Sequence, residues 1–323
     1  MPYAIRIHET GGPEKMRWEE VRVETPGPGQ VLVRNTAIGL NFIDTYHRSG
    51  LYPVALPVTL GMEGAGIVET VGPKVSGFKA GERVAYAQPI GAYAEWVLRQ
   101  ADRLVKIPAG IDDKIAAAMM LKGMTAQYLL RRTYKAKAGD MILVHAAAGG
   151  VGQILCQWAK HLGATVIGTV GSDEKVKLAK KAGCKHVIVT AQEKFPERVK
   201  EITKGVGVPV VYDGIGKDTF MGSLDCLAPL GLMVSYGSAS GAVPPFELAI
   251  LSQKGSLFLT RPTLMTYTAK REDLLKSAAE LFSVVKKGAV KITINQTYPL
   301  KEAAQAHRDL ESRKTTGSTV LLP

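Results

Sequence analysis

The chain of 323 residues is poor in cysteine. Its three cysteines, Cys156, Cys184 and Cys226, form no C-x-x-C pair. This spacing argues against a disulfide framework and against a cysteine-based structural zinc site. The sequence also lacks an uninterrupted apolar run of about 18 residues, which a membrane-spanning helix requires. The first residues have no apolar stretch after a basic start, so we expect no secretory signal and a cytoplasmic location.

Acidic residues are fewer than basic ones, with 29 Asp and Glu against 41 Lys and Arg, for a net charge of +12. Such an excess can mark a nucleic-acid-binding surface. The basic residues are scattered, however, and the sequence has no basic tail and no RNA-binding motif. The pattern favours an ordinary protein surface over nucleic acid, with some of the charge available to an anionic phosphorylated ligand.

Short segments of alternating apolar and polar residues fill the first third of the chain. They are Gln30–Leu40, Gly64–Gly72, Glu82–Ala87 and Gly91–Arg99, and turns rich in Gly and Pro separate them. Regularly spaced short strands of this kind are typical of a compact, barrel-like β unit.

From Met141 onward, apolar strands alternate with helical segments. This repeat predicts an α/β fold in which a doubly wound parallel sheet carries helices on both faces. Residues 113–134 are predicted to be helical, with a break near Lys122-Gly123. A helix over Lys270–Lys286 precedes a strand–helix–strand tail that we expect to return to the first unit. The predicted boundaries are 1–122, 123–265 and 266–323.

The segment "HAAAGGVGQ" follows the first of these apolar strands and opens a helix. It departs from the dinucleotide fingerprint G-x-G-x-x-G only at Ala147. Gly149 and Gly150 allow phosphates to approach the backbone, Gly152 allows close packing, and the free N–H groups of a helix N-terminus suit a pyrophosphate. The turn therefore predicts a bound dinucleotide. We interpret His145, which ends the strand, as a packed core residue and not as a base.

The residues after the second strand of this unit bear on which dinucleotide binds. An NAD site usually has an acidic residue there, whereas this strand ends at Gly171-Ser172. The Ser172 hydroxyl and the Lys175 ammonium suit a 2′-phosphate, although Asp173 and Glu174 oppose one. Ser172 is also expected to cap the following helix. NADPH is favoured over NADH.

Several motifs carry a family resemblance that covers essentially the whole chain. The segments "AGERVAY", "LKGMTAQYLL" and "HAAAGGVGQ" resemble the medium-chain dehydrogenase/reductase superfamily. More closely, "IGLNFIDTYHRSGLYP", "LGMEGAGIVETVG", "VVYDGIG" and "GSLFLTRPTL" resemble NADPH:quinone oxidoreductases of the zeta-crystallin type. The resemblance implies a GroES-like catalytic domain from 1–122 and 266–323, and a Rossmann-type NADP-binding domain from 123–265.

The zinc alcohol dehydrogenases of this superfamily hold a catalytic metal with a Cys and a Gly-His-Glu motif. Here no cysteine precedes Cys156, and the motif becomes Gly61-Met62-Glu63, so we expect no metal. Glu63 is expected to be a buried carboxylate paired with an arginine or a backbone group. The resemblance then implies zinc-independent hydride transfer from NADPH to a quinone. The alternatives are an NADPH-dependent 2-alkenal or enone double-bond reductase, and a non-catalytic NADPH- or RNA-binding crystallin-like protein.

The resemblance also implies site residues. It places Asn41, Asp44 and Tyr46 beside the nicotinamide, with Asn41 and Tyr46 as catalytic candidates and Tyr52 lining the quinone pocket. Asp44 could equally cap a helix, and the hydroquinone protons could come from water. The full set of predicted cofactor-binding residues is Asn41, Asp44, Tyr46, Thr125, Gly149, Gly150, Val151, Ser172, Lys175, Tyr236, Gly237, Ser238, Thr260, Arg261 and Gly317.

The apolar segment Gly255–Pro262 is predicted to form a strand at the edge of the parallel sheet. Because an unpaired apolar edge strand invites association, we expect it to pair with its copy in a homodimer.

Overall fold

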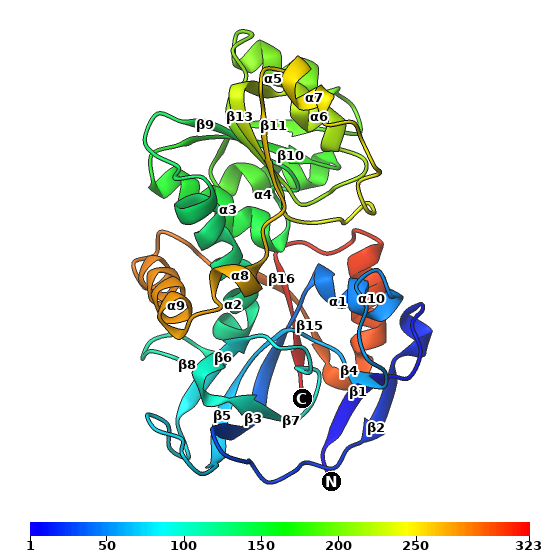
Figure 1. Ribbon diagram of the computed structural model, residues 1–323, viewed down its shortest axis with the longest axis vertical. Coiled ribbons are helices and arrows are strands. Elements are labelled where there is room, and N and C mark those ends of the chain that lie inside the picture. Colours follow the sequence, from blue (N-terminus) through cyan, green and yellow to red (C-terminus); the bar gives the residue numbers. More distant parts are fainter. The chain divides into compact units, whose positions relative to one another are not determined.

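We describe the protein from a computed structural model that covers residues 1–323. The chain forms two compact units, each described here by itself (Figure 1). The first unit consists of Met1–Met124, Thr268–Lys286 and Ile292–Pro323, and the second of Thr125–Tyr267 with Lys287–Lys291. The packing of Lys287–Lys291 with the second unit has no counterpart in the sequence-based boundaries. None of the helices combines the length and the hydropathy that a membrane crossing requires.

The first unit is built around a seven-stranded sheet with the order β15-β16-β3-β5-β6-β8, in which β7 also pairs with β3. A separate sheet has the order β2-β1-β4. The elements are β1 (Tyr3–Ile7), β2 (Arg17–Glu20), β3 (Gln30–Leu40), α1 (Phe42–Ser49), β4 (Val58–Thr59), β5 (Glu63–Val71), β6 (Arg83–Ala87), β7 (Trp96–Gln100), β8 (Val105–Lys106), α9 (Arg271–Lys286), β15 (Ile294–Pro299), α10 (Ala303–Glu311) and β16 (Ser318–Leu322).

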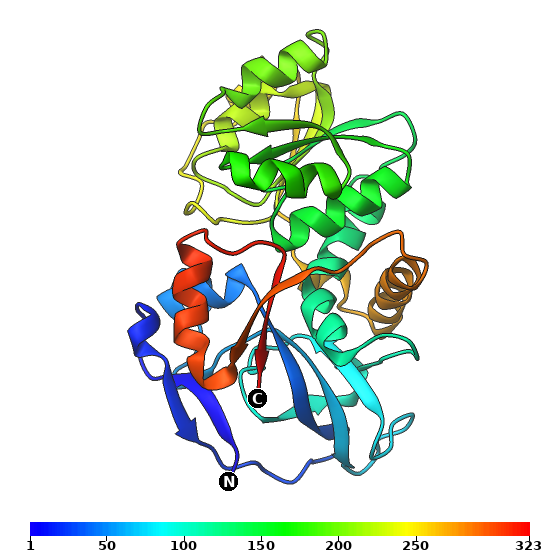
Figure 2. The ribbon, with the colours of Figure 1, turned by 180° about the vertical axis from the view of Figure 1, so that it is seen from behind.

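The C-terminal tail completes this sheet, as the sequence predicts. Strand β16 pairs antiparallel with β3, where Leu321 lies opposite Ile38, and parallel with β15. Figure 2, seen from behind, shows the red C-terminal strand beside the blue β3. The unit therefore joins chain segments that are almost the whole sequence apart.

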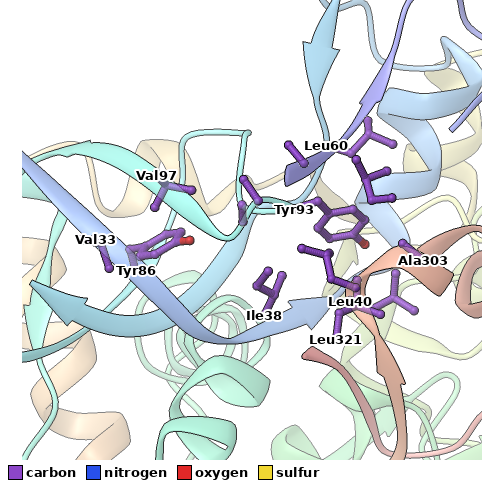
Figure 3. Close-up of a cluster of buried hydrophobic side chains, with 14 of the residues drawn as sticks. Val33, Ile38, Leu40, Leu60, Tyr86, Tyr93, Val97, Ala303 and Leu321 are labelled. Atoms are coloured by element: carbon purple, nitrogen blue, oxygen red, sulfur yellow. The ribbon is translucent and has the colours of Figure 1, made fainter. Parts of the chain in front are cut away.

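Two fully buried tyrosines, Tyr86 and Tyr93, lie in the core of the first unit, with aliphatic side chains from both ends of the chain. Figure 3 shows this cluster, in which Leu40 and Leu60 lie near the Tyr93 ring and Val33 lies near Tyr86. Because a buried hydroxyl needs a hydrogen-bond partner, these two tyrosines bring polar chemistry into an otherwise apolar core.

The second unit is a six-stranded parallel sheet with the order β11-β10-β9-β12-β13-β14, and it matches the doubly wound α/β fold that the sequence predicts. Helices lie over both faces (Figures 1 and 2). The elements are β9 (Met141–Val144), α3 (Gly150–His161), β10 (Thr165–Val170), α4 (Val176–Lys181), β11 (Cys184–Val189), α5 (Phe195–Ile202), β12 (Val208–Asp213), α6 (Phe220–Asp225), β13 (Leu227–Ser235), α7 (Ala249–Gln253), β14 (Phe258–Thr260) and α8 (Leu264–Tyr267).

The helix break predicted near Lys122-Gly123 is wrong. Helix α2 runs without interruption from Asp113 to Tyr128, and a π-helical turn, Leu129–Thr133, follows it. The structure gives another reason for the glycine: a Cβ at Gly123 would lie 2.5 Å from Cδ1 of Leu281 on α9. Gly123 therefore permits close helix–helix packing within the first unit, at the helix-propensity cost that glycine carries.

All three cysteines are free and buried. Cys156 on α3 and Cys184 on β11 are distant in sequence, yet their sulfur atoms lie 3.5 Å apart. The hydrogen bond between them and burial raise the pKa of the Cys156 thiol well above its usual range. Cys156 is thus an unreactive core residue, as its apolar neighbours in the sequence indicate.

Candidate functional site

The predicted site residues fall into two groups, one in each unit, and we describe each group within its own unit. In the second unit, the glycine-rich turn connects β9 to α3. The left-handed residue of this turn is Ala146, with φ of 52°, and Ala147 lies outside the left-handed region. The backbone N–H of Ala147 donates to the carbonyl oxygen of Thr169 at 2.9 Å. The position where the fingerprint has its first glycine therefore accepts an alanine without strain.

Gly152 in the same turn is required by packing. A Cβ at this position would lie 2.2 Å from the carbonyl oxygen of Ala146, which is an impossible contact. At Gly149 the same test gives 3.2 Å to that oxygen, so the limit there is milder. These glycines hold the helix end close to the strand.

The first turn of α3 presents N–H groups that no helical carbonyl can accept, those of Gly150, Val151 and Gly152. Gly149 at the N-cap position has no side chain to satisfy them. These donors, together with the positive end of the helix dipole, fit a phosphate group. The residues present therefore match the predicted dinucleotide site.

A series of buried polar side chains includes His145, which follows β9 at the start of this turn. His145 Nε2 and the Ser223 hydroxyl are 2.9 Å apart, and that hydroxyl donates to Oδ2 of Asp213 at 3.0 Å. Since a serine has one proton to donate, His145 must donate from Nε2 and accept from Thr169 at Nδ1, 2.9 Å away. Burial lowers the pKa of His145. His145 is therefore a fully engaged core residue, as predicted.

Asp213 is a functional candidate that sequence reasoning missed. Its Oδ1 accepts the backbone N–H groups of Ile215 (2.8 Å) and Gly216 (3.1 Å). Its carbonyl oxygen accepts the N–H of Tyr236 at 2.8 Å, which ties together the loops after β12 and β13. An acidic residue at the carboxyl end of a strand, followed by glycine in "VVYDGIG", was the available signal.

The loop Tyr236-Gly237-Ser238 follows β13, as predicted, and Arg261 organises it. The guanidinium donates to the carbonyl oxygens of Ser235 and Gly237, each at 2.8 Å, and to the Ser238 hydroxyl at 3.1 Å. Thr260, at the end of β14, pairs with Val234. The structure thus places Arg261 as a brace of the loop.

Ser172 and Lys175 lie beyond β10, at the carboxyl edge of the sheet. Ser172 takes an N-cap position, but its hydroxyl makes no capping hydrogen bond, so the predicted side-chain cap is wrong. The reason is local: Asp173–Lys175 form a 3-10 turn, and α4 begins only at Val176. Lys175 is half-buried. Thr125, on α2, has its hydroxyl next to that of Tyr128, with which it makes a hydrogen bond.

In the first unit, Asp44 is the third residue of α1, and Asn41 takes the N-cap position. Its Oδ2 accepts the backbone N–H of Asn41 at 2.9 Å and the Tyr93 hydroxyl at 2.8 Å. Asp44 is fully buried, and its Oδ1 has no hydrogen-bond partner. Burial raises the pKa of Asp44 to about 7, against the opposing effect of these donors. The helix-capping alternative for Asp44 is therefore confirmed.

Glu63 forms an ion pair with Lys122 inside the protein. Its Oε1 lies 2.7 Å from Lys122 Nζ and accepts the Asn41 side-chain amide at 2.8 Å. Its Oε2 accepts the backbone N–H of Leu121 at 2.6 Å. The expected backbone partner is present, but the cation is a lysine and not an arginine. Lys122 lies on α2 and is 59 positions from Glu63 in the sequence, so no local sequence pattern connects the two residues.

Tyr46 and Tyr52 form an aromatic cluster at α1. Their ring centroids are 5.1 Å apart with an edge-on geometry, and Phe42 lies 5.7 Å from Tyr46. The N–H of Tyr52 donates to the carbonyl oxygen of Tyr46 at 3.1 Å. Gly317, the remaining predicted residue, has φ of 62°, and a Cβ there would lie 2.7 Å from the Thr293 carbonyl oxygen.

Met62 is buried next to Glu63, with 2% of its surface exposed. No group of three or more His, Cys, Asp or Glu side chains lies close enough together to hold a metal ion. The positive charge next to Glu63 is that of the Lys122 ammonium.

Comparison with known proteins places this architecture in a family. Residues 27–109 match the model of the alcohol dehydrogenase GroES-like domain, and residues 150–283 match that of the zinc-binding dehydrogenases. A quinone oxidoreductase of Pseudomonas aeruginosa is 55% identical over 325 residues, covering 100% of both chains. A 2-haloacrylate reductase of a Burkholderia species is 51% identical, covering 100% of this chain and 99% of the relative.

Among solved structures, the quinone oxidoreductase of Escherichia coli in complex with NADPH superposes with a TM-score of 0.98 at 51% identity, and the match covers 99% of this chain and 100% of that one. Full-length identity of this degree, together with the GroES-like unit and the Rossmann-type sheet, shows that the chain belongs to the quinone oxidoreductase family of the medium-chain dehydrogenases and reductases.

Proposed function

We propose that the protein is a zinc-independent NADPH:quinone oxidoreductase. The observation that carries this proposal is the 55% identity, over the full length of both chains, to a relative named as a quinone oxidoreductase. The proposed reaction consumes one quinone, one NADPH and one proton, and it yields hydroquinone and NADP⁺. When bound, NADPH supplies the hydride.

The second unit supplies the proposed cofactor site. The N–H groups of Gly150 and Val151 would bind the pyrophosphate, since they have no acceptor within the helix. The Ser172 hydroxyl and the Lys175 ammonium would bind the 2′-phosphate. The hydroxyl of Ser172 makes no capping bond, which leaves it available for this contact. The NADPH complex of the Escherichia coli relative supports this choice of cofactor.

The first unit supplies the proposed acceptor site, with Tyr46 and Tyr52 as aromatic surfaces for the quinone ring. The side-chain N–H groups of Asn41 already donate to the carbonyl oxygen of Gly39 and to Glu63. Asn41 would therefore hold the loop in place instead of donating to a developing oxyanion. A quinone spreads the negative charge left by hydride over its conjugated ring, so the reaction can proceed without a Lewis acid, and the one proton that the reaction consumes can come from water.

Steady-state NADPH oxidation with 1,4-benzoquinone, after exhaustive chelation of metals, tests this proposal. We expect turnover that added zinc does not increase. Lys175→Ala should raise the KM for NADPH about tenfold through loss of a charge-assisted contact, and leave the KM for NADH unchanged. Lys177→Ala, which removes an exposed lysine two residues away, is the matched control. Absence of turnover with any quinone would contradict the proposal.

A second candidate function is NADPH-dependent reduction of an activated carbon–carbon double bond. It is favoured by the 51% identity to a 2-haloacrylate reductase over the full chain. Both reactions deliver hydride to a conjugated electrophile, so the same site could serve either. Measuring kcat/KM for a quinone, a 2-alkenal and 2-chloroacrylate with the same enzyme preparation ranks the candidates.

We further propose a homodimer that forms through β14. This strand is the outer edge of the parallel sheet, and Phe258 on it is 60% exposed. Pairing with its two-fold copy would cover the edge. Phe258→Lys should give a monomer in sedimentation velocity, whereas Val206→Lys, at a residue that is also exposed (67%) but lies outside β14, should not. A monomeric wild type would refute this part.

The finer assignments complete the proposal. The zeta-crystallin type rests on the motifs around Asn41 and Glu63 that the sequence shares with that branch. A cytoplasmic location is supported by the three buried cysteines, none of which forms a disulfide, although the sulfur atoms of Cys156 and Cys184 lie 3.5 Å apart. Fractionation of cells that express a tagged protein would test it.

A further inference from the structure

A chain of buried polar side chains joins α1 to α10 in the first unit. Arg48 Nη1 lies 3.1 Å from His307 Nδ1, and His307 Nε2 lies 3.1 Å from the Tyr93 hydroxyl. That hydroxyl donates to Oδ2 of Asp44 at 2.8 Å. Asp44, Tyr93 and His307 are fully buried, and Arg48 is 3% exposed. At the outer end, Glu311 accepts two hydrogen bonds from Arg48, at 2.7 and 2.9 Å.

The direction of every bond in this chain follows from one residue. An arginine can only donate, so His307 Nδ1 must be the acceptor and Nε2 must carry the proton. His307 Nε2 then donates to the Tyr93 oxygen, and the Tyr93 proton is left for Asp44. Burial lowers the pKa of His307 to about 3, so the ring is neutral and keeps this tautomer. All donors point toward Asp44.

The direction of these hydrogen bonds limits what this series of side chains can do. It cannot bring protons from solvent, because Arg48 would have to give up its own proton and arginine does not do so in proteins. It can hold the Asp44 carboxyl group in one orientation. Asp44 in turn accepts the N–H of Asn41 and so fixes the start of α1, the helix that carries Tyr46 and leads to Tyr52.

We propose that Tyr93 and His307 are positioning residues of the acceptor site, which act through Asp44 on α1 and make quinone binding depend on the protonation of Asp44. The proposal rests on the quinone reductase activity proposed above. Neither residue lies in α1 or in the predicted site, and Tyr93 and His307 are 214 positions apart in the sequence.

The groups that face Asp44 support a titration near neutral pH. The Tyr93 hydroxyl, the Asn41 N–H and the ammonium of Lys122 on α2 lower its pKa, and Glu63 on β5 raises it, while burial, the largest cause, brings it to about 7. Arg48 lies on the same helix as Asp44, and neutral His307 on α10 lies beyond Tyr93. The unpartnered Oδ1 is the atom that would carry the proton. Loss of the Tyr93 donor must raise the pKa further.

Tyr93→Phe tests the proposal, with Tyr86→Phe as its matched control. Each substitution deletes one hydroxyl from a fully buried tyrosine of the same core (Figure 3), and Tyr86 donates to Asn35 at 2.9 Å, not to Asp44. The measurement is kcat/KM for the quinone from about pH 5 to 9. Wild type should show an inflection near 7. Tyr93→Phe should move it about one unit upward and raise KM with kcat retained.

Three further results decide the matter. Tyr86→Phe should keep the wild-type inflection, and Asp44→Asn should abolish it. Infrared difference spectra should show the band of a neutral carboxyl group, and Asp44→Asn should remove this band. His307→Asn should raise the pH midpoint at which the band disappears. This measurement needs neither enzyme activity nor a stable Tyr93 variant. Equal pH profiles for Tyr93→Phe and Tyr86→Phe, or an unmoved carboxyl midpoint, would overturn the inference. Absence of quinone turnover with a normal carboxyl titration would instead overturn the proposed function alone.

Discussion

Substitution of Lys122 by methionine is the sharpest test of what the buried ion pair with Glu63 contributes to the first unit. The Lys122 Nζ to Glu63 Oε1 distance is 2.7 Å, with side-chain exposures of 7% and 0%. At an effective dielectric constant of about 20, two unit charges at this distance attract by about 6 kcal/mol before desolvation is counted. Loss of one member of such a pair leaves a buried charge alone, and it costs about 3–5 kcal/mol net.

The chain offers a matched control. Lys106 and Glu82 also lie 2.7 Å apart, but Lys106 is 54% exposed and Glu82 21% exposed. Because solvent screens this pair, Lys106→Met should change stability little or not at all. Urea unfolding followed by circular dichroism gives both free energies from midpoint and slope. Adding Glu63→Gln to Lys122→Met should restore much of the loss, since the lone carboxylate is then removed. Equal effects of the two lysine substitutions would refute the reasoning.

Three further predictions follow from other parts of the structure. Between about pH 4 and 6.5 the raised pKa of Asp44 makes stability fall with pH and the lowered pKa of His307 makes it rise, each by about 3 kcal/mol. The unfolding free energy of Asp44→Asn should therefore increase with pH and that of His307→Asn should decrease, whereas the wild type stays nearly level. Gly152→Ala places a Cβ 2.2 Å from a backbone carbonyl oxygen, so fluorescence titration should show loss of NADPH binding. Gly123→Ala should lower the free energy of unfolding by about 1–3 kcal/mol, and the double variant Gly123→Ala/Leu281→Ala should recover part of this loss in thermal unfolding. If the effects of the two single substitutions simply add in the double variant, the packing explanation is contradicted.

The sequence was sufficient for features that depend on local patterns. Alternating apolar strands and helices predicted the parallel sheet, and "HAAAGGVGQ" predicted the glycine-rich turn between β9 and α3. The sequence does not explain why an alanine is acceptable at position 147, and the structure does, because Ala146 and not Ala147 takes the left-handed conformation.

Features that depend on distant residues could not be predicted. Nothing near Glu63 in sequence indicates Lys122, and nothing near Asp44 indicates Tyr93 or His307. A glycine inside a helical pattern can mark either an interruption of the helix or close packing against another helix. For Gly123, only the position of Leu281 on α9 decides between the two interpretations. Hydrogen-bond partners far apart in sequence carry no periodic signal, so these pairs appear only once the fold brings them together.

The pairing of β16 with β3 has a consequence for how the protein is made on the ribosome. Thr319 lies opposite Leu40, so this edge of the sheet of the first unit stays open until β16 has been synthesised and released. Thr125–Tyr267, by contrast, is complete in sequence long before that point and can fold first. Until β16 arrives, the edge of β3 around Ile38 and Leu40 remains exposed to solvent and chaperones. A nonsense mutation that removes only β16 would therefore leave a folded nucleotide-binding unit attached to an unfinished, aggregation-prone partner.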